Sequence, residues 1–265
     1  MITAYRQQGC LRQANERAFS LIELLVVVAV LALLLAILSP ALRKAKDISR
    51  RLACSSNLRQ IAVASQVYLE DYGGRFYKGR SANTGYGGWQ GPLSEPGPRP
   101  LNPYLGLPEV VESAEQAEVF RCPGDDGSTS SSAMRYFDEI GTSYQTNEFL
   151  IGDYSVWLWD PILMDAVNEL VRETRMHQIG NPSEILLLGD FDWYMQWIPE
   201  APEGDVWHRR LRHFSMVFVD THTELLEIRK GLLIGPGYRI LPFPELYDQA
   251  CKAQKDLTPV PEPEP

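Results

Sequence analysis

The chain has 265 residues, 45% of them hydrophobic and 22% charged, which suits one well-filled domain with an extension better than two large domains. Residues 1–80 hold 12 Lys and Arg against 5 Asp and Glu, whereas residues 81–265 hold 13 against 29. This basic stalk and acidic head argue against nucleic acid as a partner, because most of the surface would repel phosphates.

The first predicted element is an apolar helix from Phe19 to Leu38, with the sequence FSLIELLVVVAVLALLLAIL. At 1.5 Å of rise per residue, about 20 residues cross the roughly 30 Å hydrocarbon core of a bilayer. A cleaved secretory signal would have a shorter apolar region of about 7–15 residues. A buried core helix is the other alternative, but a nearly charge-free run of this length is typical of a membrane span.

Glu23 is the one ionisable residue within this run. A carboxylate inside a span costs about 2.5–3.5 kcal/mol on insertion scales, so such a residue is usually partnered and functional. The alternative is that Glu23 lies close enough to the interface to reach water.

Residues 18–23, Ala-Phe-Ser-Leu-Ile-Glu, and the apolar run after them resemble the prepilin motif of type IV pilins and type II secretion pseudopilins. The resemblance implies that a prepilin peptidase removes a leader after Ala18, where the family usually has Gly, and that the new N-terminus at Phe19 is methylated. It also implies that Glu23 acts in assembly with other pilin-like subunits, and it matches Pro40 to a helix-kinking proline.

Charge and motif disagree about orientation. Three Lys and Arg precede the span and five follow it, and the positive-inside rule alone would place the head in the cytoplasm. We follow the resemblance, which implies an inner-membrane protein with a cytoplasmic leader and a periplasmic or extracellular head.

Beyond the anchor, apolar residues from Ile48 to Tyr72 recur at three- and four-residue steps. This spacing predicts one helix from Phe19 to Tyr72, ended by Gly73 and Gly74. In the remainder, the sequence predicts strands at 119–121, 185–188, 214–219 and 223–228, and a helix at 160–176 with Asp160 as its cap.

The predicted fold is α+β and pilin-like, with a long helix packed on a small antiparallel-sheet head. Its expected parts are the leader (1–18), the transmembrane half-helix (19–40), the amphipathic half-helix (41–72), the extracytoplasmic head (73–256) and a disordered Pro/Glu-rich tail (257–265).

Four further segments are similar to pilin-like proteins of the planctomycete-type family named for a His-x9-Asp-Gly signature. These four family-like segments are 54–60 (CSSNLRQ), 103–106 (PYLG), 120–125 (FRCPGD) and 143–147 (SYQTN). The signature itself is altered, because six residues separate His213 from Asp220 and Thr221 replaces the glycine.

Composition leaves the pairing of the four cysteines open, and none of them forms a CxxC motif. Cys54 and Cys122 both lie in family-like segments, and an extracytoplasmic compartment permits oxidation. We therefore expect a Cys54–Cys122 disulfide on the strength of the resemblance.

No enzyme motif is present, so we expect no catalysis and no cofactor. Asp190 with Asp192, and Asp220 with His222, could each present two ligands on one strand face, and calcium is the cation that the resemblance suggests. The alternative is that these are ordinary turn residues. Six tryptophans could form a glycan-binding face, although core packing is the commoner role of such residues.

These patterns predict a pilin-like or pseudopilin subunit that assembles through its N-terminal helix. The alternative is a membrane-tethered binding module for a cation or glycan that does not polymerise. An anchored hydrolase is disfavoured by the absence of catalytic motifs.

Overall fold

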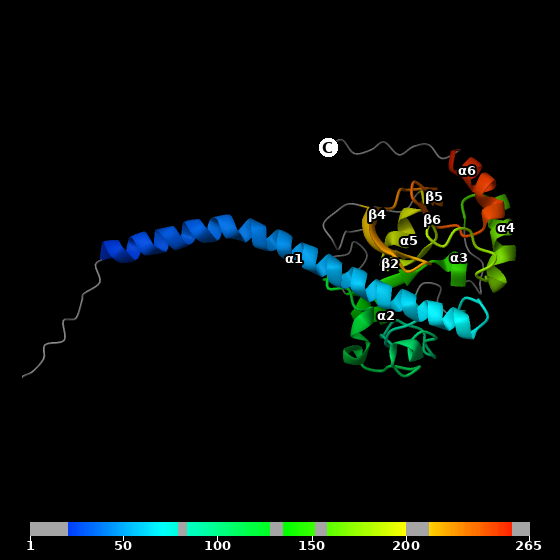
Figure 1. Cartoon of the computed structure of the whole chain (residues 1–265), viewed down its shortest axis with the longest axis horizontal. Helices are drawn as coiled ribbons and strands as arrows, with labels where there is room; N and C mark the ends of the chain where they lie inside the picture. The colour runs from blue at the N-terminus through cyan, green and yellow to red at the C-terminus, as the bar shows by residue number, and fades with distance from the viewer. Residues whose placement is uncertain (1–20, 79–83, 128–134, 152–157, 200–211, 256–265) are drawn as a thin grey trace, which may run out of the picture. The chain divides into compact units, whose positions relative to one another are not determined.

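The computed structural model describes residues 21–78, 84–127, 135–151, 158–199 and 212–255 (Figure 1). The chain separates into two compact units, Met1–Lys46 and Asp47–Pro265. The predicted leader, including Ala18 and Phe19, and the predicted tail at 257–265 lie outside the described residues.

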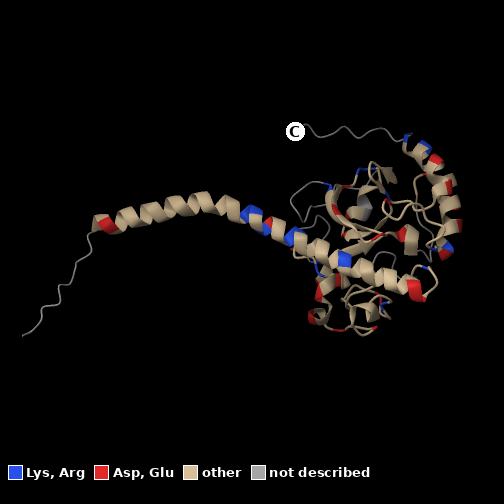
Figure 2. Ribbon diagram, in the orientation of Figure 1, with Lys and Arg blue, Asp and Glu red and all other residues tan. Residues whose placement is uncertain are grey.

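Helix α1, Leu21–Asp71, is a continuous helix of 51 residues that contributes to both units. It matches the predicted helix within the described residues. Pro40 lies inside α1, where its missing N–H removes one backbone hydrogen bond. Every residue from 21 to 46 is exposed, and Figure 2 shows that this stretch carries little charge between Glu23 and the basic cluster that begins at Arg43.

In the second unit, one face of α1 is buried at three- and four-residue spacing from Cys54 to Leu69. The predicted apolar stripe is longer than this buried face, because Ile48, Leu52 and Tyr72 are exposed. The buried residues on this face include Cys54, Leu58, Ile61, Ala62, Ser65 and Leu69. The helix ends where Gly73 and Gly74 adopt φ values of 63° and 76°, a left-handed conformation that favours glycine.

The head contains a four-stranded antiparallel sheet in the order β1-β2-β3-β4. Its strands are β1 (Tyr144–Thr146), β2 (Leu186–Asp190), β3 (His213–Phe218) and β4 (Thr223–Glu227). A two-stranded ribbon pairs β5 (Ile234–Gly235) with β6 (Tyr238–Arg239). The predicted α+β fold with a small antiparallel sheet is thus confirmed, including the β3–β4 hairpin.

Short helices connect the strands: η1 (Pro103–Leu105), η2 (Ala114–Phe120), α2 (Tyr136–Ile140), α3 (Glu148–Ile151), α4 (Pro161–Leu170), η3 (Val171–Glu173), α5 (Trp193–Gln196), η4 (Pro244–Leu246) and α6 (Tyr247–Lys255). Asp160 caps α4 as expected, accepting a hydrogen bond from the Leu163 N–H at 2.8 Å.

Two of these predictions need correction. The strand predicted at 119–121 is wrong, because Val119 and Phe120 belong to the 3-10 helix η2, and the apolar pattern there reflects burial of Phe120. The helix predicted at 160–176 is too long: α4 ends at Leu170, and a 3-10 turn then leads to Thr174, whose backbone is extended.

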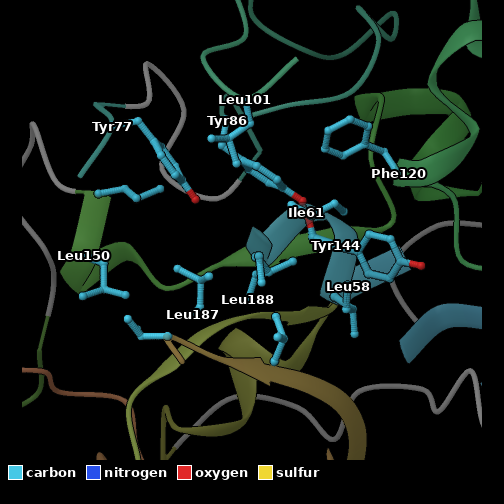
Figure 3. Packing of buried hydrophobic residues seen from close by; sticks show 14 of the residues in the cluster. Leu58, Ile61, Tyr77, Tyr86, Leu101, Phe120, Tyr144, Leu150, Leu187 and Leu188 are labelled. Atoms are coloured by element: carbon cyan, nitrogen blue, oxygen red, sulfur yellow. The ribbon is translucent and has the colours of Figure 1, made fainter. Parts of the chain in front are cut away.

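The sheet lies between two apolar clusters, because alternate side chains of a strand point to opposite faces. Val217 packs in the cluster that contains the buried face of α1, whereas Met216 and Phe218 pack in the cluster that contains α4 and α6 residues. Figure 3 shows the first cluster, where Leu58 and Ile61 of α1 lie among Leu188, Tyr86 and Tyr144. Burial on both faces explains why β2 is apolar without alternation.

Candidate functional site

The N-terminal stretch combines a carboxylate with a long apolar surface. Glu23 lies in the first turn of α1, where the helix dipole favours a negative charge. An apolar stretch of 18 residues of the helix has none of its residues buried. By length and composition alone, the helix could cross a membrane.

The first family-like segment meets the third through a covalent bond. Cys54 on α1 forms a disulfide with Cys122, with a Cα–Cα distance of 5.1 Å and a sequence separation of 68. Beside it, the Asn57 side chain donates to the Arg121 carbonyl at 2.9 Å. This is the pair that the resemblance implies, and among the described cysteines only Cys251 is a free thiol.

Asp125 joins the third family-like segment to the fourth. Its buried carboxylate accepts hydrogen bonds from the Phe137 N–H at 2.8 Å, the Tyr136 N–H at 3.2 Å and the Ser143 hydroxyl at 2.7 Å. Burial raises the pKa of Asp125, although these hydrogen bonds favour its charged form. Asp125 therefore fixes the start of α2 and the approach to β1.

The buried residue Asn147 holds the fourth family-like segment, 143–147, in place. The Asn147 amide donates to the carbonyls of Leu186 at 2.8 Å and Ile240 at 2.7 Å, and so satisfies main-chain acceptors that would otherwise be buried without donors. The family-like residues that the structure describes in these segments therefore act as structural connectors around the end of the sheet.

The first pair of candidate cation ligands does not share a strand face. Asp190 ends β2 and accepts from the Ser215 N–H at 2.7 Å. Asp192 lies after the strand at a φ of 73° and accepts from the Tyr136 hydroxyl at 3.1 Å. Because β2 ends at Asp190, the alternation of side chains that predicted a shared face does not extend to Asp192.

The second pair lies at the opposite end of β3. The Asp220 carboxylate contacts the His222 imidazole, with 2.5 Å between Oδ1 and Nδ1, and the His222 ring stacks on Phe218. Because Gly189 pairs with Met216 and Leu186 with Phe218, the register separates Asp190 from the turn that holds Asp220. The structure thus does not bring the four candidate ligands together.

Within the described ranges, one group of His, Cys, Asp or Glu residues has ligand atoms close enough to share an ion. It consists of Cys54, Cys122 and Asp190, but the two sulfurs are bonded to each other and are not thiolates. Among the tryptophans that the structure describes, Trp193 and Trp197 are fully buried in the core and offer no face to a glycan; Trp157 and Trp207 lie outside the described residues.

The altered signature lies in the β3–β4 turn. Thr221 has a φ of 75°, and its N–H donates to the Phe218 carbonyl at 2.9 Å. The turn therefore keeps a left-handed residue at the position where the family has glycine, although this chain places a β-branched residue there.

Sequence reasoning missed a cavity of about 600 Å³ near the end of α1. Its lining includes Tyr68 and Tyr72 from the helix, Arg75 and Lys78 from the segment after it, and Arg99 from the Gly/Pro-rich region. Tyrosines one helical turn apart, followed by two cations, are the local pattern that could have suggested it. The approach of Arg99 depends on the tertiary fold.

A family model described as the prokaryotic N-terminal methylation motif matches residues 13–39. This match covers the end of the predicted leader and the apolar run, including Glu23. No curated protein and no solved structure matches the chain. The motif, together with the long apolar helix, supports a membrane-anchored, type IV pilin-like protein.

Proposed function

We propose that the chain is a pilin-like or pseudopilin subunit that assembles through its N-terminal helix in a type IV pilus or type II secretion-like system. It acts by assembly and not by catalysis, and needs no cofactor for that role. The methylation motif carries this proposal, because it lies on a helix stretch whose residues from 21 to 46 are all exposed.

The exposed stretch from 21 to 46 suits both a lipid bilayer and, later, the interior of a filament. Lipid covers its apolar side chains while the subunit is held in the membrane, and neighbouring helices cover them once subunits pack together. Glu23 pairs with the methylated amine of Phe19 on a neighbouring subunit, which offsets the cost of burying each charge.

The remaining parts of the proposal concern processing and placement. Prepilin peptidase cuts between Ala18 and Phe19, the leader stays in the cytoplasm and the head lies outside it. Three of the four family-like segments support placing the chain among the His-x9-Asp-Gly proteins, because their residues form the disulfide and the Asp125 and Asn147 hydrogen bonds.

A membrane-tethered binding module is the second candidate, and the cavity near the end of α1 favours it. The two candidates differ in what they require of Glu23. A tethered module needs only an anchor, whereas a filament subunit needs a buried charge pair between subunits.

Crosslinking of Glu23→Leu against the wild type, in cells that carry the native assembly machinery, separates the two. We expect membrane insertion to be retained, because a costly carboxylate is removed, and the ladder of crosslinked oligomers to be lost. Glu70→Leu, which makes the same change at an exposed residue in the second unit, should leave the ladder intact.

Ladders of equal intensity from Glu23→Leu and the wild type would contradict the assembly role. Intact-mass measurement of the membrane-extracted chain provides the second test, with an N-terminus at methylated Phe19 expected. A chain that still begins at Met1 would exclude prepilin processing.

A further inference from the structure

Two cavities lie beside the second stretch of α1 and adjoin at Tyr104. The larger one, of about 600 Å³, has Tyr68, Tyr72, Arg75, Pro98, Pro103 and Tyr104 in its lining. The smaller one, of about 400 Å³, has Arg59, Val63, Val67, Tyr104 and Leu105 in its lining. Because Tyr104 lines both, the two cavities form one elongated groove between α1 and the 98–105 segment, named here the α1 groove.

The surface of the α1 groove is accessible and largely apolar. Val63 and Val67 are each 48% exposed, and Tyr72 is 55% exposed. The helix satisfies its own backbone N–H groups in this stretch, and prolines on the facing segment have no N–H. The groove therefore offers packing surfaces to a partner and few backbone donors, which disfavours the addition of a β-strand.

The tyrosines give the groove a rigid aromatic end. The rings of Tyr68 and Tyr72 stack with centroids 4.2 Å apart, and Tyr104 meets Tyr68 edge-on at 5.7 Å. The Tyr104 hydroxyl donates to Asp71 at 2.9 Å, which holds that ring against the helix. Aromatic-lined grooves of this kind bind proline-rich segments in the polyproline II conformation.

The chain itself contains such a segment. Residues 257–265 read LTPVPEPEP, with a proline at every second position from Pro259. Proline fixes its own φ and disfavours a helical conformation at the preceding residue, so this sequence favours polyproline II. At about 3.1 Å per residue, nine residues extend roughly 28 Å. The groove follows α1 from Ser56 to Tyr72, which is about 24 Å at 1.5 Å per residue.

The charges of the segment and the groove are complementary. Residues 256–265 contain three carboxylates and no Lys or Arg. Arg59 and Arg75 line the two parts of the groove, and both are exposed. Among the residues that the structure describes, neither arginine takes part in an ion pair. Glu109 also lines the groove, so a bound acidic segment would place its carboxylates toward the arginines.

The position of α6 favours the segment of another copy over that of the same chain. Helix α6 ends at Lys255 and packs on α4. The 3-10 turn after α4 leads to Thr174, whose carbonyl accepts from the Phe76 N–H beside the groove. Figure 1 accordingly shows α4 between α6 and the end of α1. A segment of the same chain would use part of its length to pass α4 before reaching the groove.

We propose that the α1 groove binds the acidic, proline-rich segment 257–265 of a second copy of this chain. The prolines pack against the tyrosines and valines, and the glutamates lie near Arg59 and Arg75. This contact does not depend on Glu23. It would add a second link between subunits if the chain assembles as proposed.

Fluorescence anisotropy of a labelled peptide with the sequence of residues 256–265 tests the proposal on the full-length chain in detergent. We expect saturable binding. A peptide with all four prolines replaced by Ala keeps the charges but loses the polyproline II preference, so it should bind at least about tenfold more weakly. A peptide carrying Glu262→Gln and Glu264→Gln keeps the prolines and should bind severalfold more weakly.

Variants of the exposed lining residues locate the peptide. Tyr72→Leu should weaken binding about tenfold, whereas Tyr72→Phe keeps the ring and should retain binding. Arg75→Gln should weaken it severalfold. Arg172→Gln is the matched control, because Arg172 is exposed and lines neither cavity. All four variants should unfold at nearly the wild-type temperature, since the residues that they change are exposed.

Disulfide crosslinking identifies the copy that supplies the segment. In a Cys251→Ala background, which removes the free thiol, one chain carries Val67→Cys and another carries Val260→Cys. Mixing the two under mild oxidation should give a crosslinked dimer. When both changes are in one chain at low concentration, a closed monomer would overturn the assignment to a second copy.

Three further results would overturn the proposal: no saturable peptide binding, equal binding of the alanine peptide, or unchanged affinity in Tyr72→Leu. Glu23→Leu should bind the peptide as the wild type does. The crosslinking test of Glu23 and the peptide test can therefore fail separately.

Discussion

Residues 21–46 and 47–71 belong to one continuous helix, yet only the second stretch contains buried residues. Leu33, in the first, is 63% exposed, whereas Leu58, in the second, is fully buried. Ser65, a polar residue, is also fully buried in the second stretch. Apolar composition alone therefore does not decide burial; the neighbours that the fold provides decide it. The second stretch packs against the head of its own chain, whereas the first has no buried residue in the described part of the chain.

The largest expected effect on stability comes from removing the Cys54–Cys122 disulfide, which links the second stretch to the head. Replacing Cys54 and Cys122 by Ala opens a loop with a sequence separation of 68, and the chain-entropy relation gives a loss of about 4 kcal/mol in the free energy of unfolding. Denaturant unfolding of the detergent-solubilised chain measures this loss. Cys251→Ala, at the free thiol, should change the free energy much less, and an equal loss would contradict the disulfide.

A matched pair of leucine truncations tests the comparison directly. Leu58→Ala should lower the free energy of unfolding of the head by about 3 kcal/mol, through lost burial and the cavity left behind. Leu33→Ala makes the same chemical change in the exposed stretch and should alter it by less than about 0.5 kcal/mol. Similar values for the two variants would show that the two stretches do not differ in the way described.

Asp125 sharpens the comparison by adding a pH dependence confined to the head. Asp125→Asn loses an acceptor and should cost about 1–2 kcal/mol near neutral pH. Because burial raises the folded pKa above the ordinary 3.8, the folded state binds more protons. This contribution to stability is fully present below the ordinary pKa and is lost as pH rises through the folded pKa.

Unfolding curves of the wild type and Asp125→Asn across that acidic range measure the difference. The advantage of the wild type should be largest at the acidic end and should shrink as the pH rises. A difference that grows with pH would mean that the hydrogen bonds from Phe137 and Ser143 outweigh burial.

The smallest expected effect is at the β3–β4 turn. Thr221→Gly should raise the free energy of unfolding by about 0.5–1 kcal/mol, because the left-handed conformation costs an L-residue about 1–2 kcal/mol and glycine returns part of this in backbone entropy. Thr221→Ala keeps the Cβ atom and should bring no comparable gain. Thermal unfolding distinguishes the two variants.

Local sequence patterns predicted an element correctly where it is long or where capping residues mark its ends. The period of α1, its stop at Gly73 and the Asp160 cap were all readable from the sequence. Strand β1, Tyr144–Thr146, was not predicted, because three residues that are all buried show no alternation. Helix α6 was also missed: only Ala250 and Ala253 of its residues are buried, and two alanines give a weak apolar stripe.

For the candidate site, too, some residues were identified from the sequence and others depend on the tertiary structure. The prepilin-like residues and the Cys54–Cys122 pair came from a resemblance to a family. The metal hypothesis relied on a strand face that Asp192, with its positive φ, does not share. The cavity near the end of α1 could not be predicted, because Arg99 and Tyr72, which both line it, are far apart in the sequence and share no local period.

The position of the disulfide also has a mechanical consequence. Cys54 lies seven residues beyond the first residue of the second unit, so a pulling force transmitted along the helix enters the head through a covalent bond soon after Asp47. The 68-residue separation to Cys122 then cannot extend. At up to about 3.5 Å per residue, the bond withholds roughly 240 Å of contour length from stretching. A chain under tension would therefore extend first in segments outside this loop.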